Sequence, residues 1–153
     1  SGISCEGEIG FVGYSGGEAS AGTDPSEAAL FAAETGVDAM AISVGNVHLQ
    51  QDKEGGLDEP RIAAIQAATN TPLVIHGGSG VPVAQRKHLA KNTNVCKFNI
   101  STELRMAFGS ALRDAVNSDP SRFDRVTILK ETHDPVMAAA RIVLRNLKDE
   151  SVD

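Results

Sequence analysis

Four short runs with the pattern of β-strands alternate with segments of helical periodicity, and this alternation limits the possible folds more than any other feature of the sequence. The runs lie at residues 3–9, 38–44, 73–76 and 95–100. The second run is nearly continuously apolar, as expected for a parallel strand that is covered on both faces. Strands that alternate with helices predict a parallel α/β sheet, either an open doubly wound sheet or part of a barrel. Periodicity alone leaves both architectures open.

Local signals place helices between these strands. Asp24 is expected to cap a helix that has Pro25 at its first position and ends at Gly36. The glycine- and serine-rich segment 13–22 has no regular pattern and is predicted to be a mobile loop. Further helices are predicted over residues 60–69, 82–92, 101–116 and 135–147.

Length and composition exclude several classes of protein. The chain has 153 residues and a formal net charge of −6 without a basic run, which argues against a nucleic-acid surface. No apolar run is long enough for a membrane span. The two cysteines, Cys5 and Cys96, are interpreted as buried thiols of a cytoplasmic protein. The length fits one domain but falls short of the roughly 250 residues of a complete (β/α)8 barrel.

Two histidines follow neighbouring strands. His76 ends a strand and is followed by Gly77-Gly78-Ser79-Gly80, a segment whose backbone N–H groups could cradle an anion at a helix N-terminus. His48 follows the preceding strand in the same way. Two imidazoles at neighbouring strand ends can share one Zn2+. The alternatives are a tight turn with a buried histidine and a hydrogen-bonded loop histidine.

Polar residues at two further strands complete the candidate site. Glu6 and Glu8 are two residues apart on a strand and therefore face the same side, where a cation partner, an Arg or a metal, is expected. Asn99 and the following Ser101 and Thr102 lie where the fourth strand leads into a helix and could bind phosphate or substrate hydroxyls. A solvated strand end and a plain helix cap are the alternatives.

Together these segments resemble the class II fructose-bisphosphate and tagatose-bisphosphate aldolases. The matching segments occur in family order over about residues 3–120: EGEIG at 6–10, TDP at 23–25, TGVD at 35–38, GNVH at 45–48, PLVIHGGSG at 72–80 and KFNISTEL at 97–104. The resemblance implies a (β/α)8 TIM barrel to which this chain supplies about the last four βα units.

The resemblance also implies a metal centre. His48 and His76 would be two ligands of the catalytic Zn2+, and Glu8 would lie near the metal and bind it in an alternative position. The zinc would polarise the substrate ketone and stabilise an enediolate. Glu18, on the loop after the Glu8 strand, is the candidate base that exchanges the substrate proton. A monovalent cation near the phosphate site is also compatible with the family.

The resemblance further implies a substrate pocket and a partner. The phosphate of dihydroxyacetone phosphate and the substrate backbone would be bound by Gly77, Gly78, Ser79, Asn99, Ser101 and Thr102. The family segment that supplies another zinc ligand and an acid/base aspartate has no counterpart here, so the N-terminal half of the barrel is expected as a partner. A homodimer is also expected, because dimers are common in the family.

Three departures from the family pattern bear on activity. Leu49 stands where the family usually has a glycine beside the zinc histidine, and Ser101 where fructose-bisphosphate enzymes often have aspartate. The loop around Glu18 is short and lacks the acidic cluster that is usual in the family. The leading hypothesis is zinc-dependent cleavage or formation of a ketose 1,6-bisphosphate, with fructose 1,6-bisphosphate as the expected substrate. The alternatives are a non-catalytic aldolase-like subunit or phosphosugar-binding module, and an unrelated phosphate-binding barrel such as an isomerase.

Overall fold

The computed structural model describes residues 2–14, 20–49 and 56–148. The chain divides into two compact units, Ser1–Ile100 and Ser101–Asp153. The first unit contains both candidate histidines and both candidate glutamates of the metal centre. The second unit is helical throughout its regular structure.

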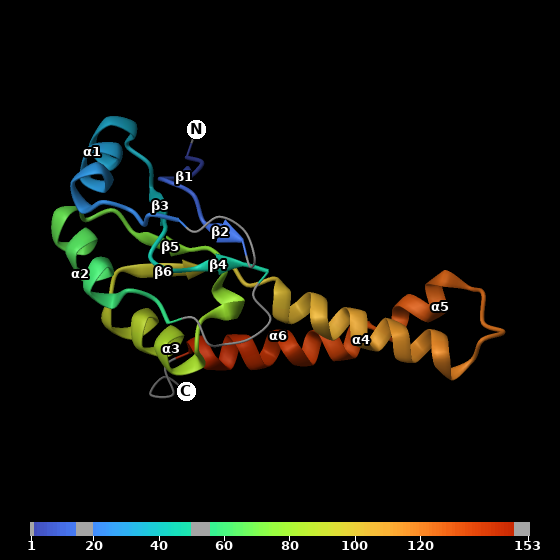
Figure 1. Cartoon of the computed structure of the whole chain (residues 1–153). Helices are drawn as coiled ribbons and strands as arrows, with labels where there is room; N and C mark the ends of the chain where they lie inside the picture. Colours follow the sequence, from blue (N-terminus) through green and yellow to red (C-terminus); the bar gives the residue numbers. More distant parts are fainter. Residues whose placement is uncertain (1, 15–19, 50–55, 149–153) are drawn as a thin grey trace. The chain divides into compact units, whose positions relative to one another are not determined.

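A four-stranded parallel sheet organises the first unit (Figure 1). Its strands follow the order β1-β3-β5-β6, and every neighbouring pair is parallel. The bounds are β1 Glu6–Glu8, β3 Ala39–Ile42, β5 Leu73–Ile75 and β6 Val95–Phe98. A second, small parallel sheet joins β2 (Gly13–Tyr14) to β4 (Val47–His48). Three helices connect the strands of the main sheet: α1 Pro25–Thr35, α2 Glu59–Ala68 and α3 Val83–Asn92.

One face of the main sheet forms the hydrophobic core. Met40 and Ile42 of β3 and Leu73 and Ile75 of β5 are fully buried in one cluster with residues of the helices, namely Ala28, Ile62, Ile65 and Leu89. Strand side chains alternate between faces, so the residues between these positions lie on the other face. The four-strand alternation predicted from sequence is therefore confirmed, and the helices cover one side of it.

The opposite face carries a row of side chains in register. Glu8 pairs with Ala41, Ala41 with Val74, and Val74 with Lys97 across the four strands. Glu6 pairs with Ala39 one step earlier. Neighbouring residues in register on parallel strands project from the same face, so charged side chains at both outer strands flank small or aliphatic residues in the middle.

The ends of α1 follow the sequence prediction. Asp24 is the N-cap, and its carboxylate accepts hydrogen bonds from the backbone N–H groups of Ser26 and Glu27. Gly36 ends the helix in the left-handed conformation, with φ of 64°, and donates its N–H to Ala32 O. A residue with a side chain would be strained at such an angle, which explains the glycine.

The second unit consists of three helices. These are α4 Thr102–Ser118, α5 Arg125–Lys130 and α6 His133–Leu147. Helices α4 and α6 pack against each other, and Ala115 and Val143 are their buried apolar residues. Ser101 occupies the N-cap position of α4 but makes no side-chain capping hydrogen bond. In the described part of the chain, no helix is both long and apolar enough to cross a bilayer.

Three sequence-based expectations were wrong. Gly13 and Tyr14 form β2 instead of a loop, because two-residue pairing with β4 is set by tertiary contact and leaves no periodic signal. Helix α5 was not predicted, since six residues are too few to display helical periodicity. Cys5 and Cys96 are free and exposed, not buried.

The Asp24 cap predicts a pH dependence of stability. The pKa of Asp24 lies below its ordinary value, first because the Ser26 hydroxyl donates to the carboxylate and then because the Glu27 and Ser26 N–H groups do. A lowered pKa in the folded state adds stability that is present at neutral pH and is lost as the pH falls through the folded pKa. The free energy of unfolding lost in Asp24→Asn should therefore be largest near pH 7 and shrink below about pH 4.

Urea unfolding at several pH values measures this difference. The matched control is Glu34→Gln, which removes an exposed carboxylate near the other end of α1 and should cause no such loss. A difference between Asp24→Asn and the natural chain that stays constant from pH 7 to pH 3 would contradict the assignment.

Candidate metal and phosphate site

The candidate site lies at the carboxyl ends of the parallel strands. His48 ends β4, His76 follows β5 directly, and Asn99 follows β6. In parallel α/β sheets this edge is where ligands bind, because the strand ends and the loops after them converge there. The structure thus brings together, within the first unit, the residues that the sequence placed at separate strand ends.

Asn46 joins the two histidine-bearing segments. Its side chain is 3% exposed, and its Oδ1 accepts from the N–H of Val44 at 2.7 Å. Its Nδ2 donates to the carbonyl oxygens of Ile42 at 3.3 Å and His76 at 3.0 Å. A buried amide that satisfies three backbone groups fixes the turn after β3 against the end of β5. Sequence analysis gave Asn46 no role, although it lies in the GNVH segment two residues before His48.

His76 lies between two carboxylates. Its Nε2 is 3.4 Å from Glu6 Oε1, and its Nδ1 is 3.7 Å from Glu8 Oε1. Lys97 Nζ contacts the other oxygen of Glu6, Oε2, at 2.7 Å. The cation partner expected for the glutamates is therefore, for Glu6, a lysine and not an arginine. Lys97 first, and His76 after it, hold the pKa of Glu6 below its ordinary value against the opposing effect of partial burial.

The two imidazoles are close enough to share one ion. Their ring centroids are 6.0 Å apart and the ring planes make an angle of 49°. Two histidines on one tetrahedral zinc, with Zn–N bonds of 2.0–2.1 Å, would have centroids roughly 5 Å apart. The observed separation exceeds this by an amount that side-chain rotation can close.

The gap between His76 and Glu8 also fits a cation. Two ligand atoms on one tetrahedral zinc lie roughly 3.4 Å apart, and His76 Nδ1 and Glu8 Oε1 are 3.7 Å apart. The donor set of two imidazoles and a carboxylate is one that Zn2+ accepts. Among the residues that the structure describes, no three His, Cys, Asp or Glu side chains gather closely enough to form a complete metal site.

The glycine-rich turn after His76 is built by close backbone contact. Gly77 has φ of 65°, and a β-carbon there would overlap the backbone of Val47, the residue before His48. The N–H of Gly78 donates to Asn99 O at 3.0 Å, and this hydrogen bond joins the turn to the end of β6. Residues Gly78–Gly80 form one turn of 3-10 helix in which Ser79 is buried. The turn therefore ties the ends of β4, β5 and β6 together.

Leu49 adopts a conformation that favours glycine. Its φ is 59°, and it is the one non-glycine residue with positive φ among those described. The side chain is 52% exposed, so little burial compensates the strain. The family usually has glycine at this position, and the backbone here keeps the left-handed conformation that suits glycine although the residue is leucine.

The structure gives no position relative to this centre for three of the predicted site residues. Glu18, the candidate base, lies outside the described residues. Ser101 and Thr102 belong to the second unit, at the start of α4. The downstream end of the Glu18 loop is anchored in the first unit: Thr23 Oγ1 accepts from the N–H of Ser43, and Ser43 Oγ donates to Ser20 Oγ.

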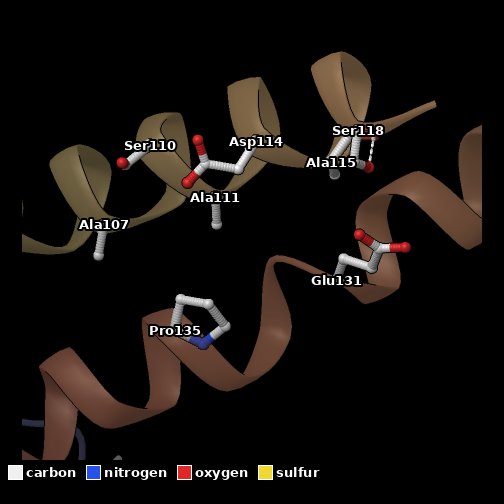
Figure 2. A pocket seen from close by; sticks show the side chains of 8 residues that line it. All are labelled: Ala107, Ser110, Ala111, Asp114, Ala115, Ser118, Glu131 and Pro135. Atoms are coloured by element: carbon white, nitrogen blue, oxygen red, sulfur yellow. Dashed lines mark hydrogen bonds between the residues drawn. The ribbon is translucent and has the colours of Figure 1, made fainter. Parts of the chain in front are cut away.

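The second unit has a groove of its own, between α4 and the segment that leads into α6. Figure 2 shows Ala107 and Ala111 of α4 on one side and Pro135 of α6 on the other. Its volume is about 440 Å3. The polar residues in its lining are Ser110, Asp114, Ser118 and Glu131. None of the described residues that line it is basic, so the groove does not suit a phosphorylated ligand.

The turn after His76 predicts a stability difference between two glycines. Gly36→Ala should cost about 1–2 kcal/mol, the usual strain of a side chain at positive φ, because a β-carbon there meets nothing within 4 Å. Gly77→Ala should cost more, because the same strain is joined by the overlap with Val47. Equal losses of unfolding free energy in urea would contradict the close packing of this turn.

At Leu49 we expect a substitution to stabilise the protein, in contrast to the two glycine substitutions. Leu49→Gly should raise the free energy of unfolding by up to about 1 kcal/mol, because relief of left-handed strain exceeds the extra entropy of glycine in the unfolded chain. Leu49→Ala is the matched control, since it trims the exposed side chain and keeps the strain. Stabilisation by alanine as well as glycine would show that the side chain, and not the backbone angle, is unfavourable.

Comparison with known proteins identifies the family. The family model described as Fructose-bisphosphate aldolase class-II matches residues 1–151. A curated relative, the fructose-bisphosphate aldolase of Geobacillus stearothermophilus, is 33% identical over 141 residues, which are 90% of this chain and 49% of that protein. The chain thus spans about half the length of this relative.

Solved structures agree on the fold. The YdjI aldolase of Escherichia coli K12 matches with a TM-score of 0.70 and 27% identity over 99% of this chain and 51% of its own. The fructose-bisphosphate aldolase of Campylobacter jejuni matches with a TM-score of 0.62 and 21% identity, and the match covers 82% of this chain and 44% of that chain. The predicted fold class is confirmed, and the parallel α/β sheet corresponds to part of a (β/α)8 barrel. The chain belongs to the class II fructose-bisphosphate aldolase family.

Proposed function

We propose that this chain forms the C-terminal half of a zinc-dependent aldolase that interconverts a ketose 1,6-bisphosphate with dihydroxyacetone phosphate and glyceraldehyde 3-phosphate. Fructose 1,6-bisphosphate is the proposed substrate. Membership of the family supports aldolase chemistry in general. The proposed zinc ligands are supported by the geometry of the site, whereas the substrate and the roles of Glu18, Ser101 and Thr102 are proposed from membership of the family.

One observation carries the proposal. The imidazoles of His48 and His76 lie with their centroids 6.0 Å apart and their planes tilted by 49°, at the carboxyl ends of parallel strands. In the proposal both rings hold Zn2+, and Glu8 lies within reach of the same ion beside His76 Nδ1. A bound zinc would supply Lewis-acid polarisation of the substrate carbonyl.

The glycine turn is the proposed phosphate site. In the proposal the turn at Gly77 and Gly78 helps to bind the phosphate, and its two glycines allow the turn to pack closely against Val47 and Asn99 beside His76. In the proposal Ser79 and Thr102 contribute to phosphate binding, Ser101 and Asn99 bind substrate oxygens, and a monovalent cation lies near the phosphate. Glu18 is the proposed group that moves the substrate proton.

The proposal requires residues that this chain does not supply. The family segment with a further zinc ligand and an acid/base aspartate is expected from an N-terminal half that completes the barrel. The coverage of about half of each relative supports this expectation. The assembled enzyme is proposed to be a cytoplasmic homodimer, in keeping with two free cysteines.

A second function is favoured by Leu49. Its left-handed backbone and large side chain stand beside a proposed zinc ligand, where the family usually has glycine. A non-catalytic aldolase-like subunit or phosphosugar-binding module would tolerate this change. Such a protein would bind a sugar phosphate without exchanging the substrate's C–H proton, whereas an enzyme would do both.

Metal removal tests the proposed function. The protein that carries this chain, assembled with its N-terminal half, should cleave fructose 1,6-bisphosphate, lose activity to a chelator and regain it with added Zn2+. His48→Ala and His76→Ala should each reduce kcat by more than roughly 10- to 100-fold, which is the usual cost of losing a residue that only hydrogen-bonds a metal ligand. Coupled detection of glyceraldehyde 3-phosphate measures the rate, and tagatose 1,6-bisphosphate serves as the competing substrate.

Controls separate the candidate functions. His88→Ala changes an exposed histidine of α3 and should leave the rate unchanged. Activity that survives complete zinc removal would refute the metal-dependent mechanism. Binding of dihydroxyacetone phosphate without proton exchange into solvent would favour the non-catalytic alternative.

A further inference from the structure

Two charged residues beside the proposed metal ligands have no part in the proposed function. Glu6 contacts His76 Nε2 with Oε1 and Lys97 with Oε2. Glu6 lies on β1 and Lys97 on β6, the two outermost strands of the sheet, and His76 follows β5 between them. The result is a continuous line of polar contacts from Lys97 through Glu6 to His76.

Small residues make this line possible. Glu6 and Glu8 are in register with Ala39 and Ala41 of β3, the strand that separates β1 from β5. An alanine methyl group leaves space above β3, so both glutamates can extend across it toward His76. A larger side chain at either alanine would occupy the path of the carboxylates.

The contacts assign different roles to the two ring nitrogens of His76. A neutral imidazole carries one proton, and the hydrogen bond made by one nitrogen determines which nitrogen is left with a lone pair. Glu6 is held in place by Lys97 and is closer to the ring than Glu8, at 3.4 Å against 3.7 Å. These distances favour the tautomer in which Nε2–H donates to Glu6 and the lone pair of Nδ1 is directed toward Glu8.

We infer that Glu6, anchored by Lys97, is the positioning residue of His76, which holds the ring so that Nδ1 is presented to a divalent cation. This inference rests on the proposed function for the identity of the cation. With the proton on Nε2, Nδ1 and Glu8 Oε1 both accept, so their 3.7 Å gap is suited to a cation between them. A carboxylate that accepts from the second ring nitrogen of a ligating histidine fixes its orientation and strengthens its binding.

The metal-free protein provides the first test. Nitrogen-15 NMR of histidine-labelled protein, with His76 assigned through His76→Asn, reports which ring nitrogen carries the proton. We expect a protected proton on Nε2 in the natural sequence, and its loss to exchange with water in Glu6→Ala and in Lys97→Met. A proton on Nδ1, or a signal that Glu6→Ala leaves unchanged, would overturn the inference.

Zinc affinity provides a second test, which depends on whether Lys97→Met weakens or strengthens zinc binding. Glu6→Ala should weaken Zn2+ binding about 10- to 100-fold, as loss of an outer-shell partner usually does. Lys97→Met removes a positive charge near the site, so simple electrostatics predicts tighter binding. If Lys97 acts by anchoring Glu6, the same substitution should weaken zinc binding instead. Competition with a chromophoric chelator measures both.

The double variant and a matched control complete the design. In a Glu6→Ala background, Lys97→Met should weaken zinc binding no further, because its effect passes through Glu6. Lys91→Met, which removes an exposed charge from α3, should leave zinc affinity unchanged. Tighter zinc binding by Lys97→Met would overturn the anchoring role.

Failure of the inference can be told from failure of the proposed function. A protein that binds no zinc contradicts the proposed function, and the metal-free NMR result then decides alone whether Glu6 orients His76. A protein that binds zinc and cleaves fructose 1,6-bisphosphate, but in which Glu6→Ala changes neither readout, keeps the function and refutes the inference.

Discussion

The site depends on one buried amide. Asn46 bonds to backbone groups of Ile42, Val44 and His76, so it fastens the turn after β3 to the end of β5. Loss of this side chain would leave buried backbone groups without partners, at about 1–3 kcal/mol for each unsatisfied group. Together with the pairing of β3 and β5, this attachment fixes the segment that carries His48 against the segment that carries His76, and Gly77 lies against Val47 at the same place.

One face of the sheet forms the hydrophobic core, and the other face carries the residues of the candidate site. Apolar residues of β3 and β5 pack against the helices on one face, and they account for the core of the first unit. The other face carries Glu6, Glu8, His76 and Lys97, whose contacts with one another lower the exposure of charge without removing it from water. A family member can therefore change its polar face with little effect on the core, because alternate residues of the same strands serve the two purposes.

The sequence predicted the fold better than it predicted the contacts of the site. Apolar alternation and the Asp24 and Gly36 caps identified the strands and α1, because these signals are local. The importance of Lys97 and Asn46 could not be predicted in the same way. Lys97 contacts a residue 91 positions earlier in the chain. Neither residue had a local signal. Strict alternation along β6 would place Lys97 on the same face as Val95, which is in the core, and only an irregularity in the pairing of β5 with β6 sets Lys97 opposite Val74 on the polar face.

The Lys97–Glu6 ion pair has a geometric consequence for the sheet. It joins strands separated by three inter-strand steps, which in a flat sheet amount to roughly 14 Å. Nζ and Oε2 nevertheless meet at 2.7 Å over the polar face. The sheet curves so that β1 and β6 approach each other over that face, and this curvature lets the Lys97–Glu6 pair span the two outer strands. An arc that is concave on its charged side is the shape that a closed barrel requires and that a flat layer does not provide.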